Sequence, residues 1–580
     1  MKFKKLAQYW QEIDQTASRL EMTAILARLF KIATAGEIDK IVNLSLGRLR
    51  PKYEGVEFSL AEIMMVRVIG AAYNQPLAQV TRAFKQKGDL GELIPNRKSS
   101  SNLTVADVYQ RLMAIAQDQG QGSQDRKVSQ MAGLLKDMDS LSAKYLVRIP
   151  INNLRLGFSE MTVLDGLSWM SSGDKNLRPA LEKAFNVCAD IGRIAREYKR
   201  GGLKALAKIQ VQVGVPLRPQ KSERLPSAGK IVEKLKTFAV EGKWDGLRVQ
   251  IHYDKHRSVG EPADLFGKKD GRFSRIFSRN LDNMTAMFPD VTAAVEKLKV
   301  DQVILDGEAV AFDKASGKLL PFQETVQRKR KHGVTDKAKE LPLKVFVYDL
   351  LFLNGKSLID QPFRLRRRQL EQILLEPIDT LELAEQAIVS DETRLRQLRE
   401  KYLSLGLEGV MCKKLDTPYQ AGARNFNWVK FKKVTQGELA DTVDAVVMGY
   451  YAGRGKRTGL GLGAFLVGVP DAKSGQVGSI AKIGTGLSDE QWREMWQRAQ
   501  KLKTKTKPIE YLVAKNLFPD VWVKPQMVVE IMADEITRSP IHAFSLALRF
   551  PRLVRWRDDK KVDEATGKTE LEKLFKLQFR

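Results

Sequence analysis

The spacing of apolar residues changes once along this 580-residue chain, and the change limits the folds open to it. Over the first part of the chain, apolar side chains recur at intervals of three and four, as in 20–32 and 180–195, which predicts helices. This spacing stops near Gly201, and the prolines that follow, from Pro216 on, indicate an extended connection. Beyond it, residues 247–253 alternate apolar with polar side chains, which predicts a strand with one buried face.

Short apolar runs bounded by polar residues and glycines continue beyond this strand. They predict further strands at Val303–Leu305, Val345–Tyr348, Trp428–Phe431, Val443–Tyr450 and Ala464–Val469, with a helix over 364–375. Short strands with glycine turns in the last third of the chain are typical of a small barrel. We therefore predict three domains: an all-α domain over 1–207, an α+β domain over 208–434 and a β-barrel over 435–580.

Basic residues outnumber acidic ones by a wide margin. Lysine and arginine number 97 against 69 aspartates and glutamates, which gives a formal net charge of +28. Positive charges in a surplus of this size repel one another unless a polyanion is the usual partner. Lysine and arginine bind nucleic acid by releasing its condensed counterions. We therefore predict a nucleic-acid partner, with a generally basic, solvated surface as the alternative.

Two cysteines, Cys188 and Cys412, are too few for a disulfide framework or a multi-cysteine zinc site. No stretch reaches the roughly 18 apolar residues that a membrane helix needs. Polar residues interrupt the N-terminal segment early, so it does not have the pattern of an export signal. We expect an intracellular, cytoplasmic protein that has no membrane partner.

The run Glu241–Arg248 carries a lysine, Lys243, in a turn between two predicted strands. A lysine in such a turn could act as a nucleophile. Its amine would first have to lose a proton, because an ammonium cannot attack phosphorus and the pKa of free lysine is about 10.4. Nearby cations and partial desolvation lower such a pKa, and Arg248 on the next strand is a candidate neighbour. By itself, Lys-x-Asp-Gly is also a composition that ordinary turns use.

Further charged motifs follow this turn in a set order. They are Phe277–Arg279, Leu305–Val310, Phe346–Leu350, Leu407–Met411, Trp428–Lys433, and Arg549–Arg552 with Arg557–Lys560. In this order they resemble the signature set of the covalent nucleotidyltransferases, most closely the ATP-dependent DNA ligases of archaeal and bacterial replicative or repair type. Lys144–Arg148 and Leu154–Gly157 look like the N-terminal DNA-binding domain of that family, so the resemblance covers nearly the whole chain.

The resemblance implies a fold and a reaction. It implies a helical DNA-binding domain, an adenylation domain and an OB-fold domain, which together form a clamp around duplex DNA. The implied enzyme seals nicks in replication, repair and recombination. Lys243 attacks the α-phosphate of ATP to give lysyl-AMP and pyrophosphate, AMP passes to the 5′-phosphate of the nick, and the 3′-hydroxyl displaces AMP. The implied cofactors are ATP and Mg²⁺, with Mn²⁺ as an alternative.

Two glutamates beside apolar strand-like runs, Glu308 and Glu408, match the metal ligands of the family. Mg²⁺ prefers hard oxygen ligands and keeps several waters, so two carboxylates suffice to hold it near the phosphates. The residue that matches Glu308 also contacts the ribose in the family. Taken alone, the pair could equally be edge-strand glutamates on a solvated face.

The resemblance also implies nucleotide contacts. Tyr348 matches an aromatic residue that stacks on adenine. Glu241 matches an acceptor for the adenine amine, a contact that would favour ATP over GTP. Lys430 and Lys432 alternate on one predicted strand and so share a face. Together with Arg424 they match residues that bind the phosphates.

Arg248 and Arg279 complete the expected nucleotide site. The arginine that contacts phosphate or the nick in the family follows a Phe-Ser pair, which this chain has twice, before Arg275 and before Arg279. We assign Arg279, because the residues around it match the family better, and Arg275 stays the alternative. We also expect Lys413, shortly after Glu408, to face the cleft.

The last motif brings Arg549, Arg552, Arg557 and Lys560 together on the third domain. By the resemblance, this domain closes over ATP, orients the departing pyrophosphate and then swings away. Closure of this kind completes a site only when substrate is present. The alternative is a basic terminal surface.

The expected partner is nicked duplex DNA, encircled by a monomer that is associated with the nucleoid. A nick occurs at any sequence, so we expect contacts to phosphates rather than bases, and binding that weakens steeply with salt. A sliding-clamp contact stays open, since we find no clamp-binding peptide. RNA ligases and GTP-dependent capping enzymes share the lysine motif and are the nearest alternative. A non-catalytic DNA-binding scaffold is another, whereas the cysteine-rich zinc module of NAD-dependent ligases has no counterpart here.

Overall fold

The computed structural model describes residues 1–98, 102–152, 154–225, 227–258, 272–330, 333–432, 442–453 and 459–577. The predicted boundary at 434/435 lies outside these residues. The chain forms two compact units, residues 1–75 with 94–433 and residues 76–93 with 434–580. Among the described helices, none combines the length and the apolar composition of a membrane span.

The first part of unit 1 is built from helices. Their apolar faces form a buried core in which Phe3 and Tyr145 each pack edge to face against Trp10. Polar side chains cap the helix ends; at α6, for example, Thr104 and Asp107 each accept a hydrogen bond from the other's backbone N–H. The helices are α1 (Phe3–Asp14), α2 (Arg19–Ile32), α3 (Ile38–Ser45), α4 (Glu62–Tyr73), α6 (Val105–Gln117), α7 (Ser123–Lys136), α8 (Ser140–Leu146), α9 (Glu160–Ser172), α10 (Arg178–Val187) and α11 (Ile191–Leu206).

The prediction of a helix over 180–195 is wrong in one respect, because the structure has two helices there. α10 and α11 are separate helices, and Cys188 between them has an extended backbone. The side chain of Asp190 accepts a hydrogen bond from Arg193 N and so caps the new helix. The helical region ends close to the predicted change near Gly201: the backbone leaves helical angles at Gly201 and Gly202, and α11 ends at Leu206.

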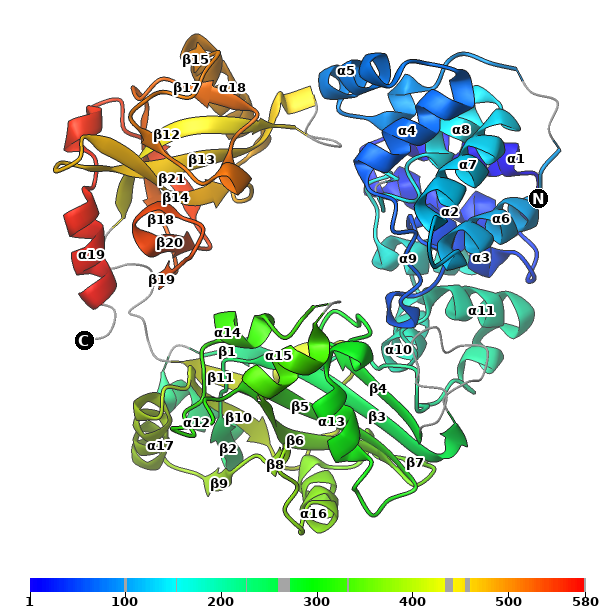
Figure 1. Ribbon diagram of the computed structural model, residues 1–580. Coiled ribbons are helices and arrows are strands. Elements are labelled where there is room, and N and C mark those ends of the chain that lie inside the picture. Colours follow the sequence, from blue (N-terminus) through cyan, green and yellow to red (C-terminus); the bar gives the residue numbers. More distant parts are fainter. Residues whose placement is uncertain are drawn as a thin grey trace. The chain divides into compact units, whose positions relative to one another are not determined.

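A connecting segment leads from α11 to two β-sheets, which Figure 1 labels. The first sheet has the strand order β1-β11-β10-β2-β9, with β1 parallel to β11 and the other neighbours antiparallel. Helices α12 (Ala228–Leu235) and α17 (Glu392–Ser404) bury one face of it. Its strands are β1 (Lys221–Arg224), β2 (Phe238–Gly242), β9 (Gln386–Val389), β10 (Gly409–Lys414) and β11 (Arg424–Lys432).

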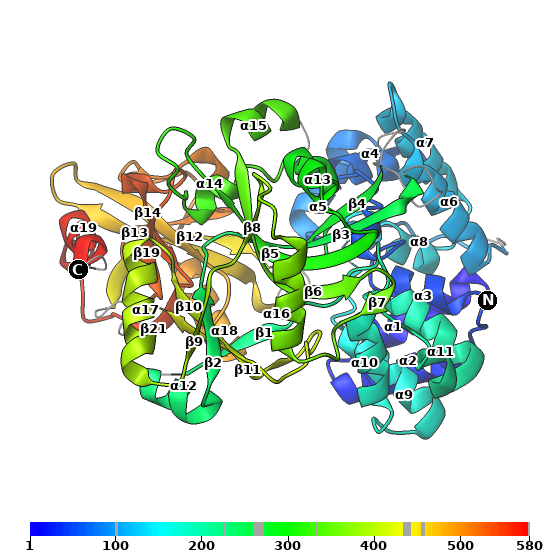
Figure 2. The same cartoon turned by 90° about the horizontal axis from the view of Figure 1, so that it is seen from below.

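The second sheet has the order β4-β3-β5-β6-β7, and β8 runs parallel to β6 beside it. α16 packs along β6, as Figure 2 shows, and α13 shares the same core. The strands are β3 (Leu247–Ser258), β4 (Arg272–Ser278), β5 (Gln302–Ala311), β6 (Leu343–Leu353), β7 (Lys356–Ser357) and β8 (Leu381–Leu383). The helices are α13 (Pro289–Val295), α14 (Phe322–Val326), α15 (Val334–Glu340) and α16 (Phe363–Ile373).

An aromatic core joins the two sheets. Tyr348 on β6 and Tyr419 before β11 each meet Trp428 edge to face, at centroid distances of 5.9 and 5.8 Å. Trp244, directly after Lys243, stacks on Phe346 at 4.7 Å. Aromatic pairs of this kind stabilise a fold beyond the area they bury. They hold the turn after β2 against the second sheet.

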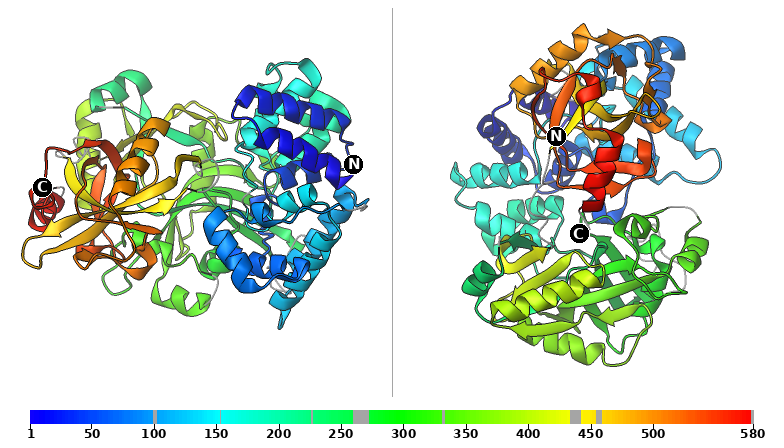
Figure 3. Two further views of the ribbon diagram at one scale, coloured as in Figure 1. Left: turned by 90° about the horizontal axis from the view of Figure 1, so that it is seen from above. Right: turned by 90° about the vertical axis from the view of Figure 1, so that its left-hand side faces the viewer.

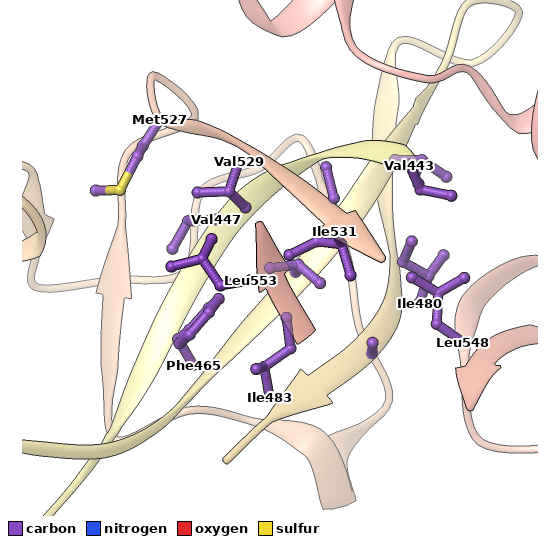
Figure 4. Packing of buried hydrophobic residues seen from close by; sticks show 14 of the residues in the cluster. Val443, Val447, Phe465, Ile480, Ile483, Met527, Val529, Ile531, Leu548 and Leu553 are labelled. Carbon is purple, nitrogen blue, oxygen red and sulfur yellow. The ribbon is translucent and has the colours of Figure 1, made fainter. Parts of the chain in front are cut away.

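Unit 2 contains an eight-stranded sheet in which β15-β17-β12-β13-β14-β16 is the main order and β18 links β12 to β21, and β19 and β20 form a separate two-stranded antiparallel sheet. Figure 4 shows Val447, Phe465, Val529 and Ile531 in its buried core. α19, red in Figure 3, packs against β13 and β19. The strands are β12 (Val443–Ala452), β13 (Leu462–Asp471), β14 (Gln476–Ile483), β15 (Lys503–Thr504), β16 (Tyr511–Leu512), β17 (Val521–Val523), β18 (Val528–Met532), β19 (Glu535–Arg538), β20 (Leu546–Arg549) and β21 (Arg552–Trp556), and the helices are α5 (Leu77–Lys87), α18 (Asp489–Lys501) and α19 (Lys568–Leu577).

The predicted strands agree with the structure. The runs at 247–253, 303–305, 345–348, 428–431, 443–450 and 464–469 are confirmed as parts of β3, β5, β6, β11, β12 and β13, and the predicted helix over 364–375 is α16. The nearly continuous apolar runs belong to strands buried on both faces, as in β6, whose residues 345–352 are all buried.

Candidate active site

The turn after β2 places Lys243 between two backbone hydrogen bonds. Lys243 N donates to Gly409 O, and Glu408 N donates to Lys243 O, both at 2.9 Å. The backbones pack closely here, since a Cβ on Gly242 would lie 2.6 Å from the Leu407 side chain. The pairing of this turn with the start of β10 therefore sets the side chains of Lys243 and Glu408 next to each other.

Lys243, Glu408 and Lys432 form a cluster of charges. The Lys243 ammonium forms an ion pair with Glu408, and Lys432 Nζ lies 2.8 Å from the same carboxylate oxygen. Burial alone would raise the pKa of Glu408, but the two lysines outweigh it and lower this pKa to about 2. Glu408 is therefore an ionised carboxylate over the whole neutral range.

Glu308 approaches the same lysine from the second sheet. It lies on β5, opposite Arg248 in the register with β3. Burial raises its pKa to about 7, although Lys243 and Arg248 act in the other direction. Within the described residues, no hydrogen bond or ion pair engages its carboxyl group. Glu308 and Glu408 thus both offer oxygen ligands of the type that Mg²⁺ prefers in the electrostatic neighbourhood of Lys243. The described part of the chain has no cluster of three or more acidic, histidine or cysteine ligands.

Arg248 points its guanidinium at Asp306. Its Nε and Nη2 donate to the two oxygens of Asp306 at 3.0 and 2.6 Å, a bidentate geometry. The hydroxyls of Tyr348 and Tyr419 donate to the same carboxylate at 3.2 and 2.9 Å. Burial opposes the charge of Arg248, but Asp306 raises its pKa. Arg248 therefore serves to lock the second sheet and the Tyr348 ring in place, a role that its motif alone did not indicate.

Glu241 ends in a buried ion pair with Lys413. Glu241 Oε2 and Lys413 Nζ are 2.6 Å apart, and both side chains are almost fully buried. Arg367 Nη1 lies 3.8 Å from the other oxygen, which also accepts a hydrogen bond from Gln386 at 3.3 Å. Burial raises the pKa of Glu241 against the effect of these cations.

The expectation that Lys413 faces the cleft is therefore wrong. Its ammonium lies 4.4 Å from the ring centroid of Tyr348 and 4.6 Å from that of Trp428. A cation over aromatic faces is stabilised by their quadrupoles. Lys413 is buried because the second sheet covers the face of β10 from which it projects. The alternation of side chains along β10 cannot reveal which face another sheet covers.

The two candidate arginines of β4 have different surroundings. Arg275 is 7% exposed, donates to Ser274 O at 2.9 Å and stacks over Phe273. Burial, with a smaller effect of Arg257, lowers its pKa to about 10. Arg279 follows the end of β4 and is exposed.

Lys430 marks the basic side of the site. Burial lowers its pKa first, and Lys432, Arg424, Lys243 and Arg279 lower it further. The structure thus brings four predicted phosphate ligands into one electrostatic neighbourhood with Lys243.

The basic residues of the last motif lie in unit 2, where each of them meets a carboxylate. The pairs are Arg549 with Glu535, Arg552 with Asp534, and Arg557 and Lys560 with Asp444. The Asp444 carboxylate accepts hydrogen bonds from Arg557 Nη1, at 2.9 Å, and from Lys560 Nζ, at 2.7 Å.

Two residues that support the site, Asp306 and Tyr419, were given no role from the sequence. Asp306 carries a signal that could have revealed it, because it precedes Glu308 by two positions on one strand and so shares a face with that motif residue. Tyr419 precedes β11 in an irregular segment and has no such signal.

A turn lysine that pairs with one carboxylate and acts on the pKa of a second, beside two sheets that an aromatic core joins, is the arrangement of a covalent nucleotidyltransferase. Residues 219–432 match the family described as "ATP dependent DNA ligase domain", residues 2–168 match "DNA ligase N terminus", and residues 458–560 match "ATP dependent DNA ligase C terminal region". The chain belongs to the ATP-dependent DNA ligase family. Members of this family are enzymes that bind ATP and DNA, use a divalent metal and form phosphodiester bonds with release of AMP.

Named relatives agree over the full length. The chain is 42% identical over 589 residues to the "Probable DNA ligase" of Dictyoglomus thermophilum, covering 100% of this chain and 98% of the relative. It is 37% identical over 609 residues to the "DNA ligase" of Sulfurisphaera tokodaii, with the same coverage. The solved structure named "Pmar-Lig_Pre" shares the fold, with a TM-score of 0.54 and 18% identity over 95% of this chain and 99% of that chain.

Proposed function

We propose that this chain seals nicks in duplex DNA through a covalent AMP adduct on Lys243. The observation that carries the proposal is the position of Lys243: its backbone is fixed by Glu408 and Gly409, and its amine pairs with Glu408 on the β10 side and is close enough to Glu308 on β5 to act on the pKa of that carboxyl. In the first step, the Lys243 ammonium releases a proton to solvent, a bond forms between the neutral Nζ and the α-phosphorus of ATP, the bond to the bridging oxygen breaks, and pyrophosphate leaves. In-line displacement of this kind depends on positioning and on neutralisation of charge.

The residues around Lys243 divide this work. Lys430 and Lys432 share one face of β11 and, with Arg279 and Arg424, neutralise phosphate charge. Glu308 and Glu408 fit a divalent cation, Mg²⁺ or Mn²⁺, because they offer hard oxygens beside the lysine. When bound there, the cation would add positive charge beside the phosphates.

Glu241 and Tyr348 are the proposed adenine contacts. Glu241 would accept a hydrogen bond from the adenine amine, and guanine, with a carbonyl at that position, would leave two acceptors facing each other. Lys413 holds the carboxylate of Glu241 in place. The proposed specificity for ATP over GTP depends on this arrangement, and Tyr348 would stack on the base.

The other steps require DNA. AMP passes from Lys243 to the 5′-phosphate of the nick, which breaks the N–P bond, and the 3′-hydroxyl then forms the phosphodiester bond as AMP leaves. We propose residues 1–207 as the helical DNA-binding domain, 208–434 as the adenylation domain and 435–580 as an OB-fold domain whose last motif orients pyrophosphate. A monomer would encircle the duplex at the nucleoid and act in replication, repair and recombination.

Mass spectrometry of the intact protein after mixing with ATP and Mg²⁺ tests the proposal. The wild type should gain the mass of AMP, a digest should place it on Lys243, and Lys243→Ala should gain none while still binding nicked DNA. An adduct formed with GTP alone would assign the chain to the capping-enzyme type. The absence of any adduct on a protein that binds nicked DNA would favour the non-catalytic scaffold.

A further inference from the structure

A cluster of basic side chains extends from the active site to the outer strand β1. In the parallel register of β1 and β11, Lys221 lies opposite Arg424 and Arg224 lies opposite Lys430. Lys221 N donates to Ala423 O at 2.9 Å, which ties the start of β1 to the start of β11. Figure 1 shows the two strands side by side. The phosphate-binding face of β11 therefore continues onto β1.

Arg218 joins this cluster from the segment before β1. Its guanidinium lies 5.0 Å from the ring centroid of Phe185 and donates to the Asn186 side chain at 3.2 Å, so it is anchored on α10. Gly422 N donates to Arg218 O at 2.8 Å, which fixes the loop before β11 to the same point. Arg218 thus lies where the helical part of unit 1 meets the β-sheets.

Among the residues that the structure describes, no carboxylate forms an ion pair with Arg218, Lys221, Arg279, Arg424 or Lys430, although most buried arginines of this chain have one. Burial lowers the pKa of Lys221; Arg218, Arg424 and Arg279 lower it further, and the smaller effect of Glu182 raises it. Crowded like charges destabilise a fold unless an anion joins them. The cluster is therefore suited to a polyanion.

The distance along the sheet separates this anion from ATP. Arg224 lies opposite Lys430, which is two residues before Lys432, and Lys432 shares the Glu408 carboxylate with Lys243. Lys221 lies a further three residues back along β1, so at about 3.3 Å per residue it is on the order of 16 Å along the strands from the nucleophile. A triphosphate whose α-phosphorus is at Lys243 does not extend that far, whereas a DNA strand does. We propose that Lys221 and Arg218 bind backbone phosphates of the nicked DNA strand as it passes from the active site toward the helical part of the chain.

This inference rests on the proposed function, and its test separates the two. Wild type, Lys221→Ala and Lys221→Arg are titrated with a labelled nicked duplex at several salt concentrations, and the nick lacks its 3′-hydroxyl so that bound DNA is not sealed. Lys356→Ala, which removes an exposed lysine from β7 of the other sheet, is the matched control.

Lys221→Ala should bind severalfold more weakly, and its plot of log affinity against log salt should be shallower by about one unit. Lys221→Arg should restore the slope, and the control should keep it. An unchanged slope, or an equal change in Lys356→Ala, would overturn the proposal. So would a loss confined to adduct formation with ATP, because the cluster would then serve the nucleotide. Failure of the wild type to form an adduct would count against the proposed function only, since the DNA titration does not depend on it.

Discussion

Lys413 and Glu241 form an ion pair, 2.6 Å between Nζ and Oε2, that is almost fully buried under the ring of Tyr348. The two residues lie on neighbouring strands, diagonal to each other, and both project from the face that the second sheet covers. A buried pair of this kind adds little net stability, but removal of one partner leaves an uncompensated charge in the interior. The pair therefore couples the stability of the fold to the residue proposed to contact adenine.

Replacement of Lys413 by Met should lower the free energy of unfolding by about 3–5 kcal/mol, because Glu241 would lose its main partner. Arg367, 3.8 Å away, compensates in part and favours the lower end of this range. The double variant Lys413→Met/Glu241→Gln should recover most of the loss, since no buried charge is left unpaired. Urea unfolding of the four proteins in a double-mutant cycle measures this coupling. A double variant no more stable than Lys413→Met would contradict it.

Lys243→Ala should reduce nick sealing by at least about 1,000-fold, because it removes the nucleophile. Lys432→Ala should retain part of the activity, since it removes only one of the two cations beside Glu408. Gel assays of sealing with excess enzyme distinguish the two variants. Equal activity of Lys243→Ala and Lys432→Ala would reject the assigned nucleophile.

Gly246→Ala should impair both folding and adenylation. A Cβ at Gly246 would lie 2.5 Å from Ala309 O and 2.8 Å from the Val310 side chain, so β3 and β5 would have to separate near Lys243. Overpacking of this kind costs about 1–3 kcal/mol. Gly133→Ala is the control, because its Cβ would meet nothing within 4 Å and alanine in helix α7 should stabilise by up to about 1 kcal/mol. Thermal unfolding should show opposite effects for the two variants, and single-turnover adduct formation should slow only in Gly246→Ala.

Stability should fall in acid partly because of His252. Its ring is fully buried, Nδ1 accepts from Gly214 N at 3.1 Å, and Nε2 lies 2.9 Å from Gln250 Oε1, an arrangement that suits the neutral ring. Burial lowers the pKa of His252 from 6.5 to about 3. Between these values the unfolded chain binds a proton that the folded chain does not, so stability is present above pH 6.5 and is lost as the pH falls toward 3.

The contribution of His252 to this loss should be about 2–3 kcal/mol between pH 7.5 and pH 4.5. Because carboxyl groups also titrate in this range, the quantity to compare is the pH dependence of the free energy of unfolding in the wild type and in His252→Gln. The variant cannot bind the proton and should show a dependence weaker by this amount. Parallel curves for the two proteins would show that His252 does not carry the effect.

Part of this site could be predicted from residue order alone. Lys243, Glu308, Glu408 and Lys430 belong to short motifs whose spacing follows the strands, and strands place alternate residues on one face. The sequence pattern therefore determined the positions of the strands and which side chains share a face. It also determined the surplus of positive charge, which favours a polyanionic partner.

Only the tertiary structure decided what covers each face. Lys413 and Lys430 project from the same face of one sheet, yet Lys413 is buried because β6 and α16 cover it, while Lys430 is only half-buried. Likewise Arg275 is buried and Arg279 is exposed, although each of them directly follows a Phe-Ser pair. Local spacing is a property of one strand, whereas burial and ion pairing depend on segments far away in the chain. For that reason the motifs identified the residues, and the packing of the two sheets set the partners and the charge of each one.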